Sequence, residues 1–238
     1  MSETALVLRV CRADMTSHSG FVWPSEIGAE VVAPDWIAND ECGNGLHGWL
    51  YGHGDHLCVD HWRDDGAKWL VLEVLLSSVV MLGGKCKFEK AAVQFIGDKY
   101  SASAFIRANE PRSAGVVCIG ESVIVGDRLA ATVGALGMAT AGNRGTATAG
   151  NYGTATAGDF GMATAGYSGT ATAGYSGTAT AGNSGTATAG NSGEIRIRYY
   201  DNTAERYRTK IAYVGEDGIK ANTPYKLNDK HEFAEVEA

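Results

Sequence analysis

An eight-residue repeat occupies the middle of the chain and restricts the fold more than any other feature. From Ala131, eight octads follow without a gap: ATVGALGM, ATAGNRGT, ATAGNYGT, ATAGDFGM, ATAGYSGT, ATAGYSGT, ATAGNSGT and ATAGNSGE. Each octad has glycine at its fourth and seventh positions. A helix would lose about 0.8–1 kcal/mol per glycine relative to alanine, and random coil needs no strict period. We therefore expect a short strand and a tight turn in every octad.

The alternation of alanine and threonine predicts a β-solenoid with a narrow interior. In residues 146–149 (TATA), the alanines would point inward and the threonines outward. With two octads per coil, the repeats would build about four coils. Gly150 and Asn151 start a turn, where both residue types tolerate positive φ. Because methyl groups can fill such an interior, we expect each chain to close its own coils, with any homodimer forming through faces or caps.

The flanks of the repeats have ordinary compositions, and the fold class expected is mainly β. Three parts are expected: an α+β N-terminal domain at 1–108, the β-solenoid of octapeptide repeats at 114–194, and a β-rich C-terminal cap with an acidic tail at 195–238. The best boundary lies at 109–113, around Pro111. Strands are expected at 6–10, 69–75 and 91–96, and a helix or strand at 101–108. The caps would protect the open strand edges of the stack.

Charge and cysteine usage exclude some classes of function. The chain has 20 basic and 27 acidic residues and a net charge of −7, so direct binding to nucleic acid is not expected. The acidity suits a basic partner, including a nucleic-acid-binding protein. The most apolar stretch, 69–83, is too short and too broken to span a membrane. Five irregularly spaced cysteines favour a reducing compartment, so we expect a cytoplasmic protein.

The octads resemble a known repeat when their frame is shifted. Residues 165–172 then read AGYSGTAT, which resembles the octapeptide repeat of bacterial ice-nucleation proteins in its Ala-Gly-Tyr start and its Thr-x-Thr pair, although the order of Ser and Gly differs. This resemblance implies regular outward hydroxyls that could match an ice lattice, whereas β-favouring residues on a soluble wall would give the same pattern. The threonines concerned are Thr140, Thr146, Thr148, Thr154, Thr156, Thr164, Thr170, Thr172, Thr178, Thr180, Thr186 and Thr188.

The N-terminal region resembles an uncharacterised family of bacterial and phage proteins. The core motif is CGNGLHGW at 42–49, accompanied by RADM at 12–15, PDW at 34–36, AKWLV at 67–71 and GGKCKF at 83–88. This resemblance implies a phage or mobile-element context and brings no established activity with it.

Six potential soft metal ligands lie within twenty residues of this region. They are Cys42, His47, His53, His56, Cys58 and His61. Zinc prefers such ligands, but these spacings match no standard zinc pattern and Cys-x-x-Cys is absent. A glycine-rich surface loop, with Cys42 and His47 packed for structural reasons, is the alternative, and we expect no metal or other cofactor.

A second alternative is enzymatic. Gly45-Leu46-His47 resembles the Gly-Leu-His strand of ADP-ribosyltransferases, which helps to hold NAD, and Glu89 would then be the candidate for the catalytic glutamate. We assign no catalytic residue on this resemblance alone.

Aromatic residues at the turns of the octads are the preferred partner-binding surface, because exposed aromatics are enriched at interfaces. The expected binding residues are Tyr152, Phe160, Tyr167 and Tyr175, which would form an irregular row, together with His47 and Trp49. The function expected first is that of a non-enzymatic, phage- or prophage-type protein that binds and inhibits a host macromolecular complex handling nucleic acid or acting in defence. The alternatives are an ADP-ribosyltransferase-like enzyme in the N-terminal domain and a structural or ice-binding β-solenoid.

Overall fold

The chain folds into two compact units of mainly β-structure. The computed structural model describes residues 3–236, and its units are Met1–Ile119 and Gly120–Ala238. The boundary expected at 109–113 therefore lies inside the first unit, and the C-terminal strands share one unit with the repeats. The mainly β fold class, with an α+β N-terminal domain before a β-solenoid, is confirmed.

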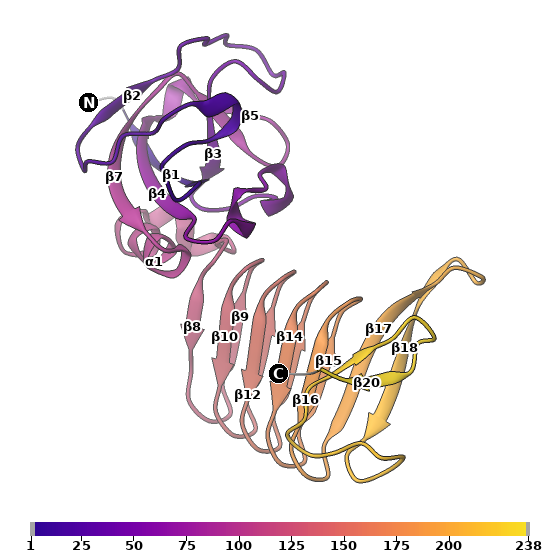
Figure 1. The fold of residues 1–238 in the computed structure, drawn as a ribbon. Helices are drawn as coiled ribbons and strands as arrows, with labels where there is room; N and C mark the ends of the chain where they lie inside the picture. Colours follow the sequence, from indigo (N-terminus) through magenta and orange to yellow (C-terminus); the bar gives the residue numbers. More distant parts are fainter. Residues whose placement is uncertain (1–2, 237–238) are drawn as a thin grey trace. The chain divides into compact units, whose positions relative to one another are not determined.

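The N-terminal unit is an antiparallel sheet (Figure 1). Its strands are β1 Thr4–Cys11, β2 Glu30–Val32, β3 Leu46–Leu50, β4 Lys68–Leu75, β5 Val80–Met81, β6 Cys86–Phe88 and β7 Lys90–Gly97. They lie in the order β2-β7-β4-β1-β3-β6-β5. The strands expected at 6–10, 69–75 and 91–96 are confirmed as β1, β4 and β7. Short 3-10 turns lie at His18–Gly20, His56–Cys58, His61–Arg63, Leu76–Ser78 and Pro111–Gly115.

One α-helix, α1 (Lys99–Asn109), packs against β1, β4 and β7. It begins where the carboxylate of Asp98 accepts hydrogen bonds from the backbone N–H groups of Tyr100 and Ser101, at 2.8 and 3.0 Å. This N-cap satisfies donors that the first helical turn leaves free. Ala102 and Ile106 are buried on the inner face of the helix. The segment at 101–108 is therefore helical.

The repeats form a β-solenoid with two octads per coil. Strands β8, β10, β12, β14 and β16 make one parallel sheet, and β9, β11, β13, β15 and β17 make the other (Figure 1). Their bounds are β8 Ser122–Ile124, β9 Ala130–Val133, β10 Met138–Ala141, β11 Thr146–Ala149, β12 Thr154–Ala157, β13 Met162–Ala165, β14 Thr170–Ala173, β15 Thr178–Ala181, β16 Thr186–Ala189 and β17 Glu194–Asp201. Residues sixteen apart pair, as Thr154 does with Thr170. Five strands per sheet give five coils, one more than the octads alone supply.

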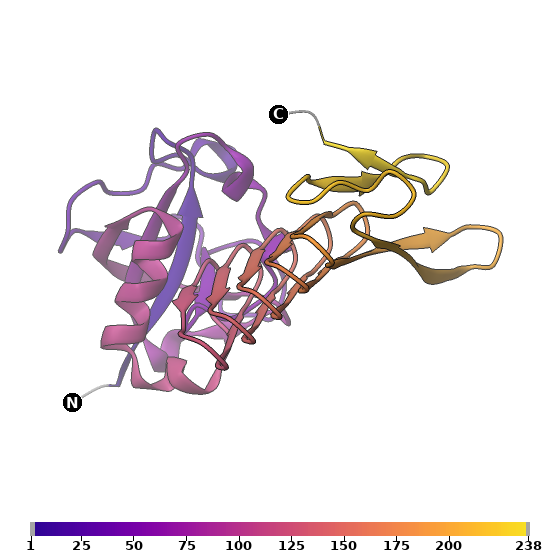
Figure 2. The ribbon, with the colours of Figure 1, turned by 90° about the horizontal axis from the view of Figure 1, so that it is seen from below.

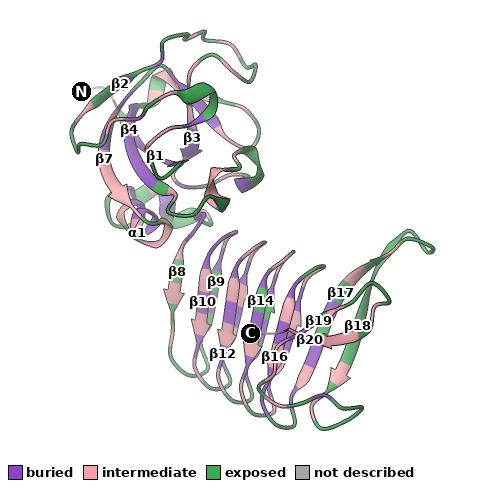
Figure 3. Cartoon of the chain, viewed as in Figure 1, coloured by how far each residue is buried: buried purple, intermediate pink, exposed green. Residues whose placement is uncertain are grey.

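Alanine fills the interior of the coils, as expected. Ala147 and Ala149 are 0% and 3% exposed, and along the strands β9 to β16 buried residues alternate with half-exposed or exposed ones (Figure 3). Bulkier side chains enter the interior at its two ends: Val133 near the N-terminal end, and Ile195 and Ile197 at the C-terminal end.

Positive φ was expected at the glycine and asparagine of each turn, but the structure places it on a different residue. The left-handed conformation falls on the sixth position of each octad, for example on Tyr152 at φ 55°, and not on the glycines. The glycines are needed instead for close packing between coils and within each turn. A Cβ on Gly150 would lie 2.7 Å from the backbone nitrogen of Ala135 in the preceding coil, and one on Gly153 would lie 2.9 Å from the Cβ of Ala149. Both contacts are shorter than side chains tolerate, so the octad needs both glycines.

Polar side chains at the fifth position connect successive turns. The Oδ1 atom of Asp127 accepts a hydrogen bond from the backbone N–H of Asn143 at 2.8 Å, and Asn143 does the same for Asp159 at 2.8 Å. Asn151 accepts from the N–H of Tyr167 at 3.0 Å on the other edge of the solenoid. These bonds satisfy backbone N–H groups in the turns, which have no partner in a neighbouring strand.

The C-terminal residues close the stack. Strand β18 (Arg206–Tyr213) pairs antiparallel with β17, and β19 (Tyr225–Leu227) pairs with β16 and with β20 (Phe233–Glu235). Figure 2 shows the β17–β18 hairpin extending beyond the coils. Ile219 and Tyr225 pack against the last alanines of the interior. The end of the stack is thus capped as expected, by antiparallel strands and bulkier apolar side chains.

We predict that Gly150→Ala destabilises the solenoid and that Gly126→Ala does not. The new methyl at position 150 strikes the backbone of the preceding coil, which should cost about 1–3 kcal/mol. Gly126 occupies the same octad position beside open space, so its replacement should change stability by less than about 0.5 kcal/mol. Urea unfolding of each full-length variant, followed by the β-sheet circular dichroism signal, measures both. Equal stabilities would contradict the close approach between coils.

Candidate functional site

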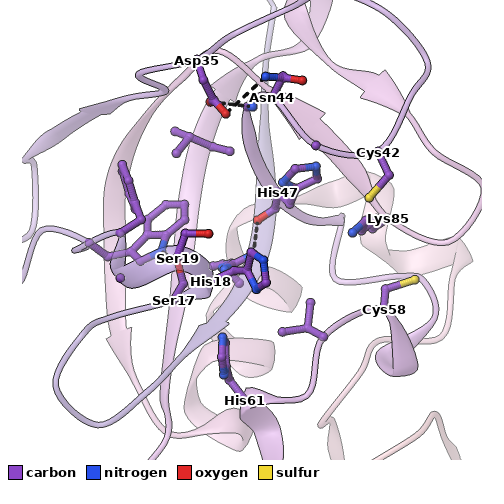
Figure 4. A pocket seen from close by; sticks show the side chains of 18 of the residues that line it. Ser17, His18, Ser19, Asp35, Cys42, Asn44, His47, Cys58, His61 and Lys85 are labelled. Atoms are coloured by element: carbon purple, nitrogen blue, oxygen red, sulfur yellow. Dashed lines mark hydrogen bonds between the residues drawn. The ribbon is translucent and has the colours of Figure 1, made fainter.

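The N-terminal unit contains a cleft of about 710 Å³ beside β1 and β3. Much of the CGNGLHGW motif lies on its wall, including Cys42, Asn44 and His47. Figure 4 shows Cys42, Lys85 and Cys58 along one side, with His47 between them and Ser17–Ser19. The cleft therefore unites segments that are distant in the sequence.

A buried arginine contributes to the wall of the cleft. Arg9 is 6% exposed, and its Nη1 donates a hydrogen bond to the carbonyl oxygen of His47 at 3.1 Å. Its guanidinium lies over the ring of Trp23, 5.0 Å from the centroid. Burial lowers the pKa of Arg9 to about 10, so the group stays charged at neutral pH. Its Nε atom is buried and has no hydrogen-bond partner among residues 3–236.

His47 is held neutral beside this arginine. Burial, reinforced by the positive charges of Lys85, Arg9 and Lys87, lowers the pKa of His47 to about 4. Its Nε2 atom is buried and, within the described residues, has no hydrogen-bond partner. The cleft wall thus combines a charged guanidinium with an uncharged imidazole.

A second buried cation, Lys87, fixes the loop that forms one rim of the cleft. Its Nζ donates to Asn39 Oδ1 at 2.6 Å and to the carbonyl oxygens of Glu41 and Gly43 at 2.8 and 3.4 Å. Lys87 is 0% exposed, and three acceptors compensate for much of its desolvation. This arrangement positions the loop that carries Cys42.

The glycines of the motif allow close packing. A Cβ on Gly45 would lie 2.8 Å from the ring of Trp36, and one on Gly48 would lie 2.3 Å from Val7 Cγ1. Asp35, in the PDW motif, accepts a hydrogen bond from the N–H of Gly45 at 3.0 Å. Local packing therefore connects the PDW motif to the CGNGLHGW motif in this chain.

The structure brings together only part of the group of six potential metal ligands. Cys42, His47, Cys58 and His61 line the cleft. The other two histidines have different surroundings: His53 Nδ1 lies 2.9 Å from the carbonyl oxygen of Val117, and His56 is buried against Trp62. Between residues 3 and 236, no three His, Cys, Asp or Glu side chains are arranged to hold one metal ion.

Two further residues singled out from the sequence take no part in the cleft. Trp49 is fully buried, stacks on Trp69 with ring centroids 6.0 Å apart, and donates a hydrogen bond to the carbonyl oxygen of Asp55. Trp49 is thus a core side chain and presents no binding surface. Glu89 is not among the residues that line the cleft beside Gly45 and His47, so the enzyme alternative lacks its carboxylate there.

The sequence reasoning missed Arg9 and Lys85. Arg9 interrupts the otherwise apolar run ALVLRVC of β1, and a single charge inside such a strand is a signal that could have identified it. Lys85 carried no comparable signal, because it precedes β6 in an ordinary glycine-rich loop.

The threonines of the solenoid form an outward array on each sheet. On the outer surface of β10, β12, β14 and β16, here called the β10–β16 face, the outward positions hold Met138, Thr140, Thr154, Thr156, Thr170, Thr172, Thr186 and Thr188. Threonines in neighbouring strands are in register, so their spacing is about 4.8 Å between strands and about 6.6 Å along a strand. Three successive coils carry the complete Thr-x-Thr pair.

The opposite array, on the β11–β15 face, is less regular. Met162 takes a threonine position in its centre and is 54% exposed. Glu194 and Arg196 continue the array as an ion pair at 2.8 Å. Arg198 and Tyr207, from the C-terminal hairpin, contribute to a groove beside this face. The two faces therefore differ in continuity although they come from the same repeat.

The four turn aromatics form two pairs and not one row. Consecutive turns lie on opposite edges of the solenoid, so Tyr152 pairs with Tyr167 and Phe160 pairs with Tyr175, each at 5.5 Å between ring centroids. Phe160 and Tyr175 are 52% and 48% exposed, and the guanidinium of Arg144 lies 5.4 Å from the Phe160 ring. The expected single row is wrong because the coil contains two octads.

Residues 5–108 match the family model described as "Domain of unknown function (DUF7666)". The N-terminal domain is a DUF7666 domain. The expected resemblance of this region to an uncharacterised family is confirmed.

The chain is also related to ice nucleation proteins, as the resemblance of the octads indicated. It is 36% identical over 110 residues to one from Pseudomonas syringae, 37% over 110 residues to one from Pseudomonas fluorescens, and 34% over 111 residues to one from Xanthomonas campestris pv. translucens. These matches cover 45–46% of this chain but span only 7–9% of the length of the relatives. No solved structure matches the chain significantly.

Over residues 3–236, the structure contains no helix with the length and apolar character needed to cross a membrane.

We predict that the free energy of unfolding decreases as the pH falls from about 6.5 to 4. In the folded chain His47 stays neutral down to a pKa of about 4, whereas an unfolded histidine titrates near 6.5, so the unfolded state binds more protons in this window. The His47→Gln variant should show a shallower decrease, measured by urea unfolding at several pH values. A residual slope is expected, because burial also lowers the pKa of His56. An unchanged slope in the variant would contradict the depressed pKa of His47.

Proposed function

We propose that the solenoid is an ice-binding module that acts through its β10–β16 face. The observation that carries this proposal is the set of seven in-register threonines on that face. Three successive strands, β12, β14 and β16, each carry the complete Thr-x-Thr pair. The relationship to proteins named ice nucleation proteins supports the same class of ligand.

A rigid, repetitive surface suits a crystalline ligand. Each coil is fixed to the next by strand hydrogen bonds, by glycine contacts and by the turn ladders, so the hydroxyl and methyl groups of the threonines are held on one lattice. Preorganisation of this kind lowers the entropy cost of binding. The β11–β15 face lacks this continuity, since Met162 interrupts it and the Glu194–Arg196 pair replaces threonine in the next strand, β17.

The proposal is binding and not nucleation by a single chain. Four successive threonine-bearing strands cover only about 15 Å along the stack, at about 4.8 Å per strand. The related proteins are more than ten times longer than the stretch they share with this chain. A short array of this kind can dock on an ice surface that already exists.

We predict that Thr156→Lys combined with Thr172→Lys strongly weakens ice binding. The two lysines would place hydrated ammonium groups in the centre of the array, and their desolvation should weaken adsorption by at least about tenfold. Inhibition of ice recrystallisation and thermal hysteresis by the full chain measure the effect. The matched control is Thr148→Lys combined with Thr164→Lys, at the same strand position on the other face. Equal losses from both pairs, or no activity in the unmodified chain, would refute the assignment.

A second candidate function is binding to a partner protein at the Phe160–Tyr175 edge, in line with the expected host macromolecular partner. Exposed aromatics next to Arg144 are typical of protein interfaces. The inhibition of a host complex would be a consequence of such binding.

We predict that Phe160→Ser combined with Tyr175→Asn removes this binding without affecting the fold, because other octads carry serine and asparagine at these positions. Cross-linking and pull-down from a host lysate, followed by titration with the purified partner, provide the measurement. Tyr152→Ser, on the opposite edge, is the control. A partner that binds both variants with unchanged affinity would exclude the Phe160–Tyr175 edge.

A further inference from the structure

We propose that the cleft of the N-terminal domain binds a small molecule through an oxyanion, either a phosphate or a carboxylate. This inference is independent of the solenoid, because every residue that carries it lies in the first unit.

The first argument is an uncompensated buried charge. Arg9 is 6% exposed, and among residues 3–236 no carboxylate lies within ion-pair distance of it. One carbonyl oxygen and the face of Trp23 are its recorded partners. Buried charges in proteins are normally paired, because desolvation of a lone charge is costly. A bound anion would supply the missing partner.

The second argument is the charge balance of the cleft wall. Lys85 lines the same cleft and has no ion-pair partner in the described part of the chain. The two aspartates on the wall are already engaged: Asp35 accepts hydrogen bonds from Gly45 and Asn44, and Asp60 lies 4.0 Å from Arg63. Neither carboxylate lies within ion-pair distance of Arg9 or Lys85 in the described residues, so these two cations remain available to a bound anion although the formal charges of the wall balance.

The third argument concerns size and shape. A volume of about 710 Å³ lies within the range of small-molecule sites. Phe21 lines the cleft and packs edge-on against Trp23, with ring centroids 5.4 Å apart. Beside this apolar side, His47 Nε2 is buried without a hydrogen-bond partner in the described chain. An apolar group with an attached phosphate or carboxylate matches all three features.

The test uses four matched probes on the full-length chain: phenyl phosphate, benzoate, benzyl alcohol and benzylamine. Isothermal titration calorimetry should show saturable binding of phenyl phosphate, benzoate or both, with Kd values below about 1 mM, and much weaker binding of the alcohol and the amine. The tighter of the two anions identifies the preferred oxyanion.

Variants then assign the binding to the cleft. Lys85→Gln should weaken anion binding by about tenfold, whereas Lys99→Gln, on α1 and outside the cleft, should leave it unchanged. Arg9→Gln should abolish it, and if that buried substitution prevents folding, the Lys85 and Lys99 variants decide. The proposal is overturned if no anion binds, if the alcohol binds as tightly as the anions, or if Lys85→Gln and Lys99→Gln have the same effect.

Discussion

Through the central coils of the solenoid, only the methyl groups of alanine fill the space between the two sheets, and the other features of the second unit depend on this. An interior of alanine brings the strands of each coil close together, so the turns must be tight and the backbone of one coil must almost touch the next. That closeness requires glycine on both sides of the turn, and the positive φ falls on the second of the two residues between them. It also keeps the sheets regular, which places the outward threonines on a common lattice.

The N-terminal domain depends on a different balance, in which buried cations are stabilised by oxygen atoms and aromatic rings. Lys87 has three oxygen acceptors and holds a loop in place, whereas Arg9 has one acceptor and an aromatic face. A structural role accounts for Lys87 in full. The contacts of Arg9 leave part of its guanidinium without a partner. For this reason Lys87 is a structural residue, whereas Arg9 is a candidate for ligand binding.

The strict period of the octads allowed the solenoid to be predicted from sequence in detail. The inward alanines follow from a period of eight and a side-chain alternation of two. The C-terminal cap follows from the open strand edges that such a stack leaves at its end. The two-octad coil also implies that the aromatics lie on two edges, because successive turns alternate between the edges of the solenoid. The single row expected from the sequence overlooked this alternation. The cleft could not be predicted in this way, because Arg9, His47 and Lys85 come together only through the pairing of β1 with β3 and of β3 with β6. Six soft ligands within twenty residues indicated a metal site, yet the chain path separates His53 and His56 from the rest.

The mismatch between an eight-residue repeat and a sixteen-residue coil has a genetic consequence. Nearly identical octads invite recombination and replication slippage, which add or remove one octad as readily as two. Loss of sixteen residues shortens the stack by a coil and leaves every remaining side chain on its original face. Loss of eight residues instead exchanges the two sheets for everything that follows, so that a threonine from one face continues the ladder of the other and Met162 can move from one array to the other. If selection maintains the residues of one face, related chains should therefore differ in length by even numbers of octads.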